Sequence, residues 1–191
     1  LDMPSLLALA AALGWASGFR LYAVVFIVGL MGATGLLALP AGLHMLENPL
    51  VLAVAGCLML VEFFADKVPW IDSAWDAVHT FIRIPAGAAL AYSVFGADQA
   101  SWGVMAALLG GTLAATSHTA KATTRAAVNT SPEPFSNIAL SLAGDAMVPG
   151  MLWLSHEYPT AFFVVLAVVI VASLAVIVML FRFLRGFLRR L

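Results

Sequence analysis

The sequence predicts an all-α integral membrane protein of about six transmembrane helices, some of them discontinuous. Of 191 residues, 63% are hydrophobic and only 10% are charged, whereas an average soluble domain carries about 25% charged residues. Apolar runs of about 20 residues, long enough to cross a bilayer as a helix, also recur along the chain. We therefore treat residues 1–191 as one transmembrane domain. The net charge of −1 gives no reason to expect a nucleic-acid partner.

The first predicted span runs from Ser5 to Ala33 and carries Arg20 within its apolar run. The small residues from Gly14 to Gly18 predict an interruption of this helix. No Lys or Arg precedes the apolar stretch from Leu6 to Leu13, and the stretch continues well beyond it. These features predict a membrane helix of the mature protein rather than a signal peptide.

The second and third spans are predicted at Pro49–Asp66 and Ile71–Phe95, after a loop that contains a short apolar piece at 36–46. Pro85 lies inside the third span and predicts a kink, because proline lacks the amide hydrogen that a helix requires. Cys57 is the only cysteine, so it cannot form an internal disulfide. Its apolar surroundings predict a buried, inert thiol.

The fourth span is predicted at Ser101–Val128, and its many Ala, Gly and Thr residues favour close helix packing. The polar, proline-containing segment 129–134 predicts a loop. The fifth span is predicted to be short and broken, from Phe135 to Leu154, with the break at 148–150. The sixth, Pro159–Leu180, contains no charged residue and has the length of an ordinary transmembrane helix.

The distribution of Lys and Arg predicts the orientation in the membrane. The basic amphipathic segment 181–190 contains four arginines and should be cytoplasmic by the positive-inside rule. Six spans would place the N-terminus on the same side. The loops assigned to the outside, 34–48, 96–100 and 155–158, contain no Lys or Arg. Aromatic residues near the span ends are expected to form an interfacial belt: Trp70, Trp75, Trp102, Trp153 and Tyr158.

An internal repeat is also predicted, with halves at 4–96 and 97–191. In the first half Arg20 precedes Asp66 and its following Val-Pro pair, and in the second half Lys121 precedes Asp145 and a similar pair. Three spans per half would give the halves opposite orientations, as in many transporters. An inverted repeat of this kind would bring the four charged groups near a shared axis.

Ionisable residues within the spans are the candidate site, because each costs about 2.5–3.5 kcal/mol to insert at the centre of a membrane helix. Asp72, Asp76, His79 and Arg83 fall at i, i+4, i+7 and i+11, which is one continuous helix face. The other candidates lie on the remaining spans: Arg20, Glu62, Asp66, His118, Lys121, Arg125 and Asp145.

These residues support a transporter or channel that moves an ion or a small polar solute through a charged interior. Carboxylates would bind a cation or relay protons, and the basic groups would offset them or hold an anion. The alternative is a non-catalytic scaffold or accessory subunit whose charges serve helix assembly. A membrane-embedded enzyme acting on lipid is the third reading, although Ser117 and His118 are sequence neighbours and point in different directions on a helix.

No cofactor is predicted, and no metal is assigned. Asp72, Asp76 and His79 have a spacing that could hold a metal, but a histidine paired with a nearby carboxylate is the commoner arrangement. The expected partners are the lipid bilayer and a small ion or polar solute. A homo-oligomer is left open.

Four blocks of the sequence are long enough to be specific: residues 14–22, 61–72, 75–85 and 127–134. They resemble an uncharacterised bacterial membrane family, the domain-of-unknown-function family 4126, over about residues 5–180. The resemblance implies a bacterial inner-membrane protein. It supplies no established activity and no site residues.

Overall fold

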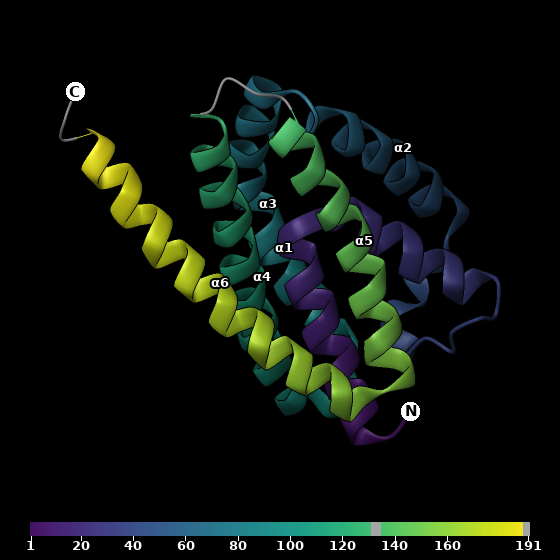
Figure 1. Cartoon of the computed structure of the whole chain (residues 1–191). Coiled ribbons are helices and arrows are strands. Elements are labelled where there is room, and N and C mark those ends of the chain that lie inside the picture. The colour runs from purple at the N-terminus through teal and green to yellow at the C-terminus, as the bar shows by residue number, and fades with distance from the viewer. Residues whose placement is uncertain (131–134, 189–191) are drawn as a thin grey trace.

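The computed structural model describes residues 1–130 and 135–188, and every regular element in these residues is helical. Figure 1 shows a bundle in which α1 lies near the centre and α6 crosses the outside. The elements are α1 (Met3–Ala33), η1 (Ala41–Glu47), α2 (Pro49–Ala65), α3 (Pro69–Ser93), η2 (Ala97–Gln99), α4 (Ala100–Val128), α5 (Phe135–Glu157) and α6 (Pro159–Leu188). The predicted loop residues 131–134 and the last two arginines, Arg189 and Arg190, lie outside the described residues.

Helix α1 changes direction at Arg20, whose backbone angles (φ −147°, ψ 73°) are not helical. The predicted interruption at Gly14–Gly18 is therefore wrong, because that stretch is helical and the break follows it. The glycines serve close packing instead. A Cβ atom on Gly14 would overlap the Cα of Gly110 in α4. At its start, α1 is capped by Asp2, whose carboxylate accepts a hydrogen bond from the Ser5 amide at 3.1 Å.

Helix α2 begins at Pro49, and the side chain of Asn48 caps it by accepting a hydrogen bond from the Leu50 amide at 2.9 Å. The prediction that Cys57 is buried is wrong, because its side chain is exposed on the surface of this helix. An apolar run in a membrane protein can face lipid as well as a protein core. Apolar surroundings in the sequence therefore did not imply burial in this case.

Helices α3 and α5 each contain a proline and are assigned as continuous. Helix α3 continues through Pro85, and α5 continues through Pro149 to Glu157. The fifth span is thus neither short nor broken, contrary to the prediction. Proline removes one helical hydrogen bond, and membrane helices tolerate this loss where neighbouring groups satisfy the freed carbonyl.

The length and composition of the described helices give a multi-pass membrane protein with three to five candidate spans. Helices α1, α5 and α6 are individually long and apolar enough to cross a bilayer. Two further pairs, η1 with α2 and α3 with α4, qualify only when each pair is taken together across a sharp bend. Six spans are therefore not confirmed. Helix α2 has only 17 residues, and α3 and α4 carry many of the charges.

The inverted repeat is not confirmed either, because the two halves pack differently. In the first half α2 packs on α1, the first helix of that half. Its counterpart in the second half, α5, also packs on α1 and makes few contacts with α4, the first helix of its own half. Figure 1 also places the start of α1 and the described end of α6 at opposite ends of the bundle. The expectation that both termini are cytoplasmic is therefore not confirmed. It rested on an even count of six spans, and the described helices give three to five candidate spans.

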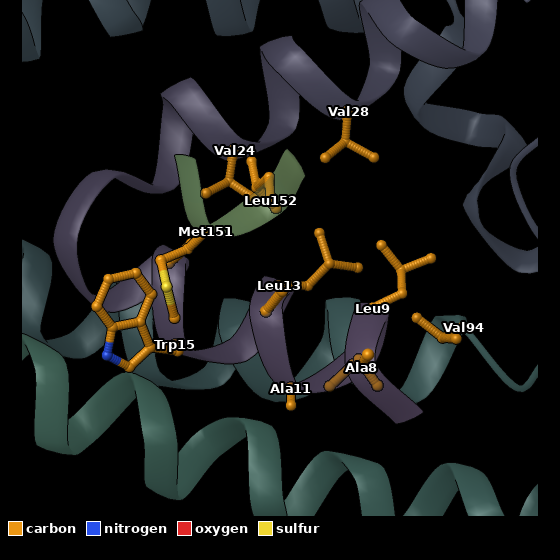
Figure 2. Packing of buried hydrophobic residues seen from close by; sticks show 14 of the residues in the cluster. Ala8, Leu9, Ala11, Leu13, Trp15, Val24, Val28, Val94, Met151 and Leu152 are labelled. Atoms are coloured by element: carbon orange, nitrogen blue, oxygen red, sulfur yellow. The ribbon is translucent and has the colours of Figure 1, made fainter. Parts of the chain in front are cut away.

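The apolar core lies around the first half of α1. Figure 2 shows Trp15 and Leu13 of α1 close to Met151 and Leu152 of α5. Behind them, α1, α3 and α4 meet at small residues: a Cβ on Gly87 would lie 2.8 Å from the Cβ of Ala114. This part of the bundle is therefore densely packed and apolar.

The aromatic residues predicted to form a belt divide into two groups. Trp70, Trp102, Trp153 and Tyr158 are exposed, with Trp70 the most exposed at 87%. Trp75 is instead partly buried, and its ring stacks on the imidazole of His79 with centroids 4.2 Å apart. The prediction therefore fails for Trp75, which packs against the interior of the protein.

A buried charged network as candidate functional site

The structure brings ten of the eleven candidate residues into one charged network between α1, α2, α3, α4 and α5, and Lys67 joins it. The network is defined by its members: Arg20, Glu62, Asp66, Lys67, Asp72, Asp76, Arg83, His118, Lys121, Arg125 and Asp145. Only Lys67 and Asp145 have side chains more than 10% exposed, at 22% and 25%. Among its members, five carboxylates face five basic side chains, so the charges balance.

Asp66 caps the C-terminal end of α2 and is the centre of the network. Its Oδ2 lies 2.5 Å from Nη1 of Arg20 and 3.0 Å from Nζ of Lys121. Arg125 donates to the backbone carbonyl of Asp66 at 2.8 Å. One fully buried carboxylate is thus surrounded by cations from α1 and α4, which offset the cost of its burial.

Arg83 is the centre of a second group, on α3. Its Nη2 lies 2.5 Å from Oε1 of Glu62, and its Nη1 lies 2.7 Å from Oδ1 of Asp76. Lys121 links the two groups, because its Nζ is also 3.2 Å from Oδ1 of Asp76. The two centres therefore form a continuous chain of ion pairs.

The hydrogen bonds of His118 fix its tautomer. Arg83 can only donate, so Nδ1 of His118 accepts its hydrogen bond at 3.2 Å. Nε2 then carries the proton and donates to Oγ1 of Thr80 at 2.7 Å, and Thr80 donates to the carbonyl of Asp76 at 3.0 Å. His118 is therefore a neutral imidazole that relays a hydrogen bond from Arg83 to α3.

His79 is the candidate that the structure leaves outside the network. Its Nδ1 lies 2.7 Å from the carbonyl of Trp75, so this nitrogen carries the proton and donates. Its Nε2 lies 3.0 Å from the hydroxyl of Tyr22, which donates to it. A metal held by Asp72, Asp76 and His79, the arrangement set aside on sequence grounds, would need a different geometry.

Several buried polar atoms of the network have no hydrogen-bond partner among the described residues, both in its central groups and at its ends. Asp145 lies 2.8 Å from Arg20 and 3.7 Å from Lys67. Asp72 is fully buried, yet neither of its carboxylate oxygens accepts a hydrogen bond from a described residue. Its nearest cation, Arg125, is 3.6 Å away. Buried carboxylates usually have such donors. Among the described carboxylates of the network, Asp72 is the one with both oxygens lacking a hydrogen-bond donor.

Sequence reasoning missed polar residues of α5 that bind the arginines. Arg20 donates to the hydroxyl of Ser141 at 3.0 Å, and Arg125 donates to the side-chain carbonyl of Asn137. Asn137, Ser141 and Asp145 fall at i, i+4 and i+8, which is one helix face. The same spacing test that was applied to the charged residues of α3 would have identified this stripe.

Three of the cavities between the described helices reach the network. One of about 140 Å³ is lined by Arg20, Lys121 and Arg125, and one of about 280 Å³ is lined by Arg20, Glu62 and Asp145. A third, of about 230 Å³, lies between α3 and α4 beside Asp76 and Arg125. Each is large enough to hold several water molecules. A small ion or solute could therefore approach these charges without unfolding the bundle.

Comparison with known proteins identifies the family and leaves the activity open. No curated protein and no solved structure matches the chain. The family model described as a domain of unknown function, DUF4126, matches residues 7–179. The match includes every residue of the charged network. The protein belongs to the DUF4126 family.

Proposed function

We propose that this protein is a transporter that moves an ion or a small polar solute across the membrane through the charged network. The observation that carries the proposal is Asp72, a fully buried carboxylate without a hydrogen-bond donor among the described residues. A charge that served only helix assembly would be expected within hydrogen-bonding distance of its partner, because an unsatisfied buried charge is costly. The carboxylate of Asp72, which lacks such a donor among the described residues, is therefore better explained by a site that receives a ligand than by helix assembly alone.

The packing around the network favours a carrier over an open channel. The three cavities reach the charges, whereas the other half of the bundle is closed by contacts between glycine and alanine residues of α1, α3 and α4. A channel requires a continuous polar path, and a carrier exposes its site to one side at a time. We place the protein in the bacterial inner membrane, with the arginine-rich C-terminal end in the cytoplasm.

A non-catalytic scaffold or accessory subunit is the second candidate, and the balance of charge favours it. Five carboxylates face five basic groups, so the network could be complete without a ligand. In that case neutralising one member would disturb assembly, and no flux would be expected from the parent protein.

Flux measurements in proteoliposomes separate the two candidates. The probes are radiolabelled sodium, radiolabelled chloride and an internal pH dye that reports protons. We expect flux of at least one probe through the parent protein and its loss in Asp66→Asn, which keeps the volume of the side chain and removes its charge. Asp98→Asn, at an exposed position outside the network, is the matched control and should retain flux. Absence of flux above that of empty liposomes, together with aggregation of Asp66→Asn, would support the scaffold instead.

A further inference from the structure

Three buried aspartates converge where α2 ends and α3 begins. One carboxylate oxygen from each of Asp66, Asp72 and Asp76 lies within 4.8 Å of the other two. Oxygens on opposite sides of a bound cation lie twice the metal–oxygen distance apart, which is about 4.6–5.2 Å for an ion the size of Ca²⁺. The trio is therefore spaced to contact one cation of that size, and Na⁺ is similar in size.

Unused oxygen atoms provide a second and independent indication of a ligand. Both oxygens of Asp72 and Oδ2 of Asp76 are buried and accept no hydrogen bond from a described residue. Asp72 is 0% exposed, and Arg125 approaches it only to 3.6 Å. Lone pairs that are buried and unused in this way are what a hard cation seeks in a protein.

Lys121 now places an ammonium group against this trio. Its Nζ lies 3.0 Å from Asp66 and 3.2 Å from Asp76, so it contacts two of the three carboxylates. Three arginines also surround the trio, but lysine carries its charge as a compact ammonium on a flexible four-carbon chain. Lys121 is thus the basic group that most resembles a bound monovalent cation.

A second position for the Lys121 ammonium lies next to the first. The side chain lines the cavity of about 140 Å³ between α1, α4 and α5. There the carbonyl of Phe19, beside the break in α1 at Arg20, is already 3.4 Å from Nζ. The ammonium can therefore leave the carboxylates without losing every polar contact.

We propose that Asp66, Asp72 and Asp76 bind a monovalent metal cation, for which Na⁺ is the probe, and that Lys121 is a tethered competitor that leaves the site when the cation enters. The site identifies a monovalent cation as the substrate class for the transport function proposed above, and this part of the inference rests on that function. A monovalent ion carries the same single positive charge as the ammonium group that it replaces. A divalent ion would add a further positive charge beside Arg20, Arg83 and Arg125.

The test uses the full-length protein in detergent, with binding of radiolabelled Na⁺ and the thermal unfolding midpoint as readouts. Choline replaces Na⁺ at constant ionic strength as the inert cation. We expect saturable Na⁺ binding that raises the midpoint of the parent. Lys121→Met removes the competitor and should lower the apparent Kd for Na⁺ at least about tenfold, which corresponds to about 1.4 kcal/mol. Arg182→Met, which removes a cation at an exposed position on α6 outside the network, should leave the Kd unchanged.

Asp72→Asn should abolish the Na⁺ response both alone and together with Lys121→Met. The inference is overturned if neither the parent nor Lys121→Met binds Na⁺, if Arg182→Met strengthens binding as much as Lys121→Met, or if Ca²⁺ binds and Na⁺ does not. Should a variant fail to fold, radiolabelled Na⁺ binding by the parent alone still decides whether the site exists. Na⁺ binding without flux would contradict the transport proposal and leave the site standing. Flux that does not depend on Na⁺ would contradict the site and leave transport standing.

Discussion

Arg83 and Glu62 form an ion pair of 2.5 Å in which neither side chain is more than 1% exposed. The pair joins α3 to α2, two helices that otherwise share few contacts. An apolar groove of about 550 Å³ lies between these helices and α1, lined by residues such as Val54 and Leu58. The pair therefore holds together two helices that apolar packing alone leaves largely separate.

Replacing Arg83 with Leu is expected to destabilise the protein strongly. The change leaves Glu62 buried without its cation and removes one partner of Asp76, and breaking a buried ion pair in this way costs about 3–5 kcal/mol. The double variant Arg83→Leu, Glu62→Leu should cost less than the sum of the two single changes. The free energy of unfolding in mixed detergent–SDS micelles measures these differences. Arg182→Leu, at an exposed position on α6, is the control and should change stability by no more than about 0.5 kcal/mol. Strictly additive losses would argue that Arg83 and Glu62 are not coupled.

Substituting Gly14 with Ala is expected to disturb the closed half of the bundle. The added Cβ would overlap the backbone of Gly110 in α4, and overpacking of this kind costs about 1–3 kcal/mol. Gly150 on α5 is the matched control, because a Cβ there meets no atom within 4 Å. Gly150→Ala should be neutral or slightly stabilising, since alanine is the better helix former. Equal thermal midpoints for the two variants would contradict the close contact of α1 with α4.

The two buried histidines are expected to be neutral and in opposite tautomers. His118 should carry its proton on Nε2, because Arg83 donates to Nδ1. His79 should carry its proton on Nδ1, because that nitrogen faces the carbonyl of Trp75. The side-chain ¹⁵N chemical shifts of histidine-labelled protein at neutral pH distinguish the tautomers, with His79→Gln and His118→Gln for assignment. The same tautomer at both positions would contradict the hydrogen bonds described above.

The orientation in the membrane can be tested with single cysteines in a Cys57→Ser background. Cysteines at positions 98 and 156 should react with an impermeant thiol reagent added to intact cells, because the segments 96–100 and 155–158 contain no Lys or Arg. A cysteine at position 130, near the basic end of α4, should react only after the membrane is permeabilised. Labelling of position 130 from outside would reverse the proposed orientation.

Charge spacing was the most informative sequence signal, and its success has a physical cause. A charged residue in a membrane helix must face other polar groups, so the interval between Asp72, Asp76 and Arg83 indicated which face of α3 points inward. All three side chains are buried. Asn137 and Ser141 carry no charge, and their weaker signal was missed.

Features that depend on the neighbours of a helix could not be predicted from local composition. Proline does not break α5 at Pro149, glycine does not break α1 at Gly14, and the non-helical residue is Arg20. Cys57 lies in an apolar run that faces outward. In each case the residue type can be read from the sequence, whereas the residues that pack against it determine its backbone conformation or its exposure.

The central claim is that the charged network is a hydrated site rather than a dry assembly contact, and thiol accessibility tests it most directly. Ala122 lines the cavity of about 230 Å³ beside Asp76 and Arg125. The variant Ala122→Cys in a Cys57→Ser background, reconstituted in liposomes, is exposed to a charged, water-soluble methanethiosulfonate reagent from each face in turn. We predict modification from one face only, and no modification of Cys57 in the parent protein, because its exposed thiol lies in an apolar run of α2 and outside the cavities that reach the network. An Ala122→Cys thiol that stays unmodified even after the liposomes are permeabilised would contradict the claim.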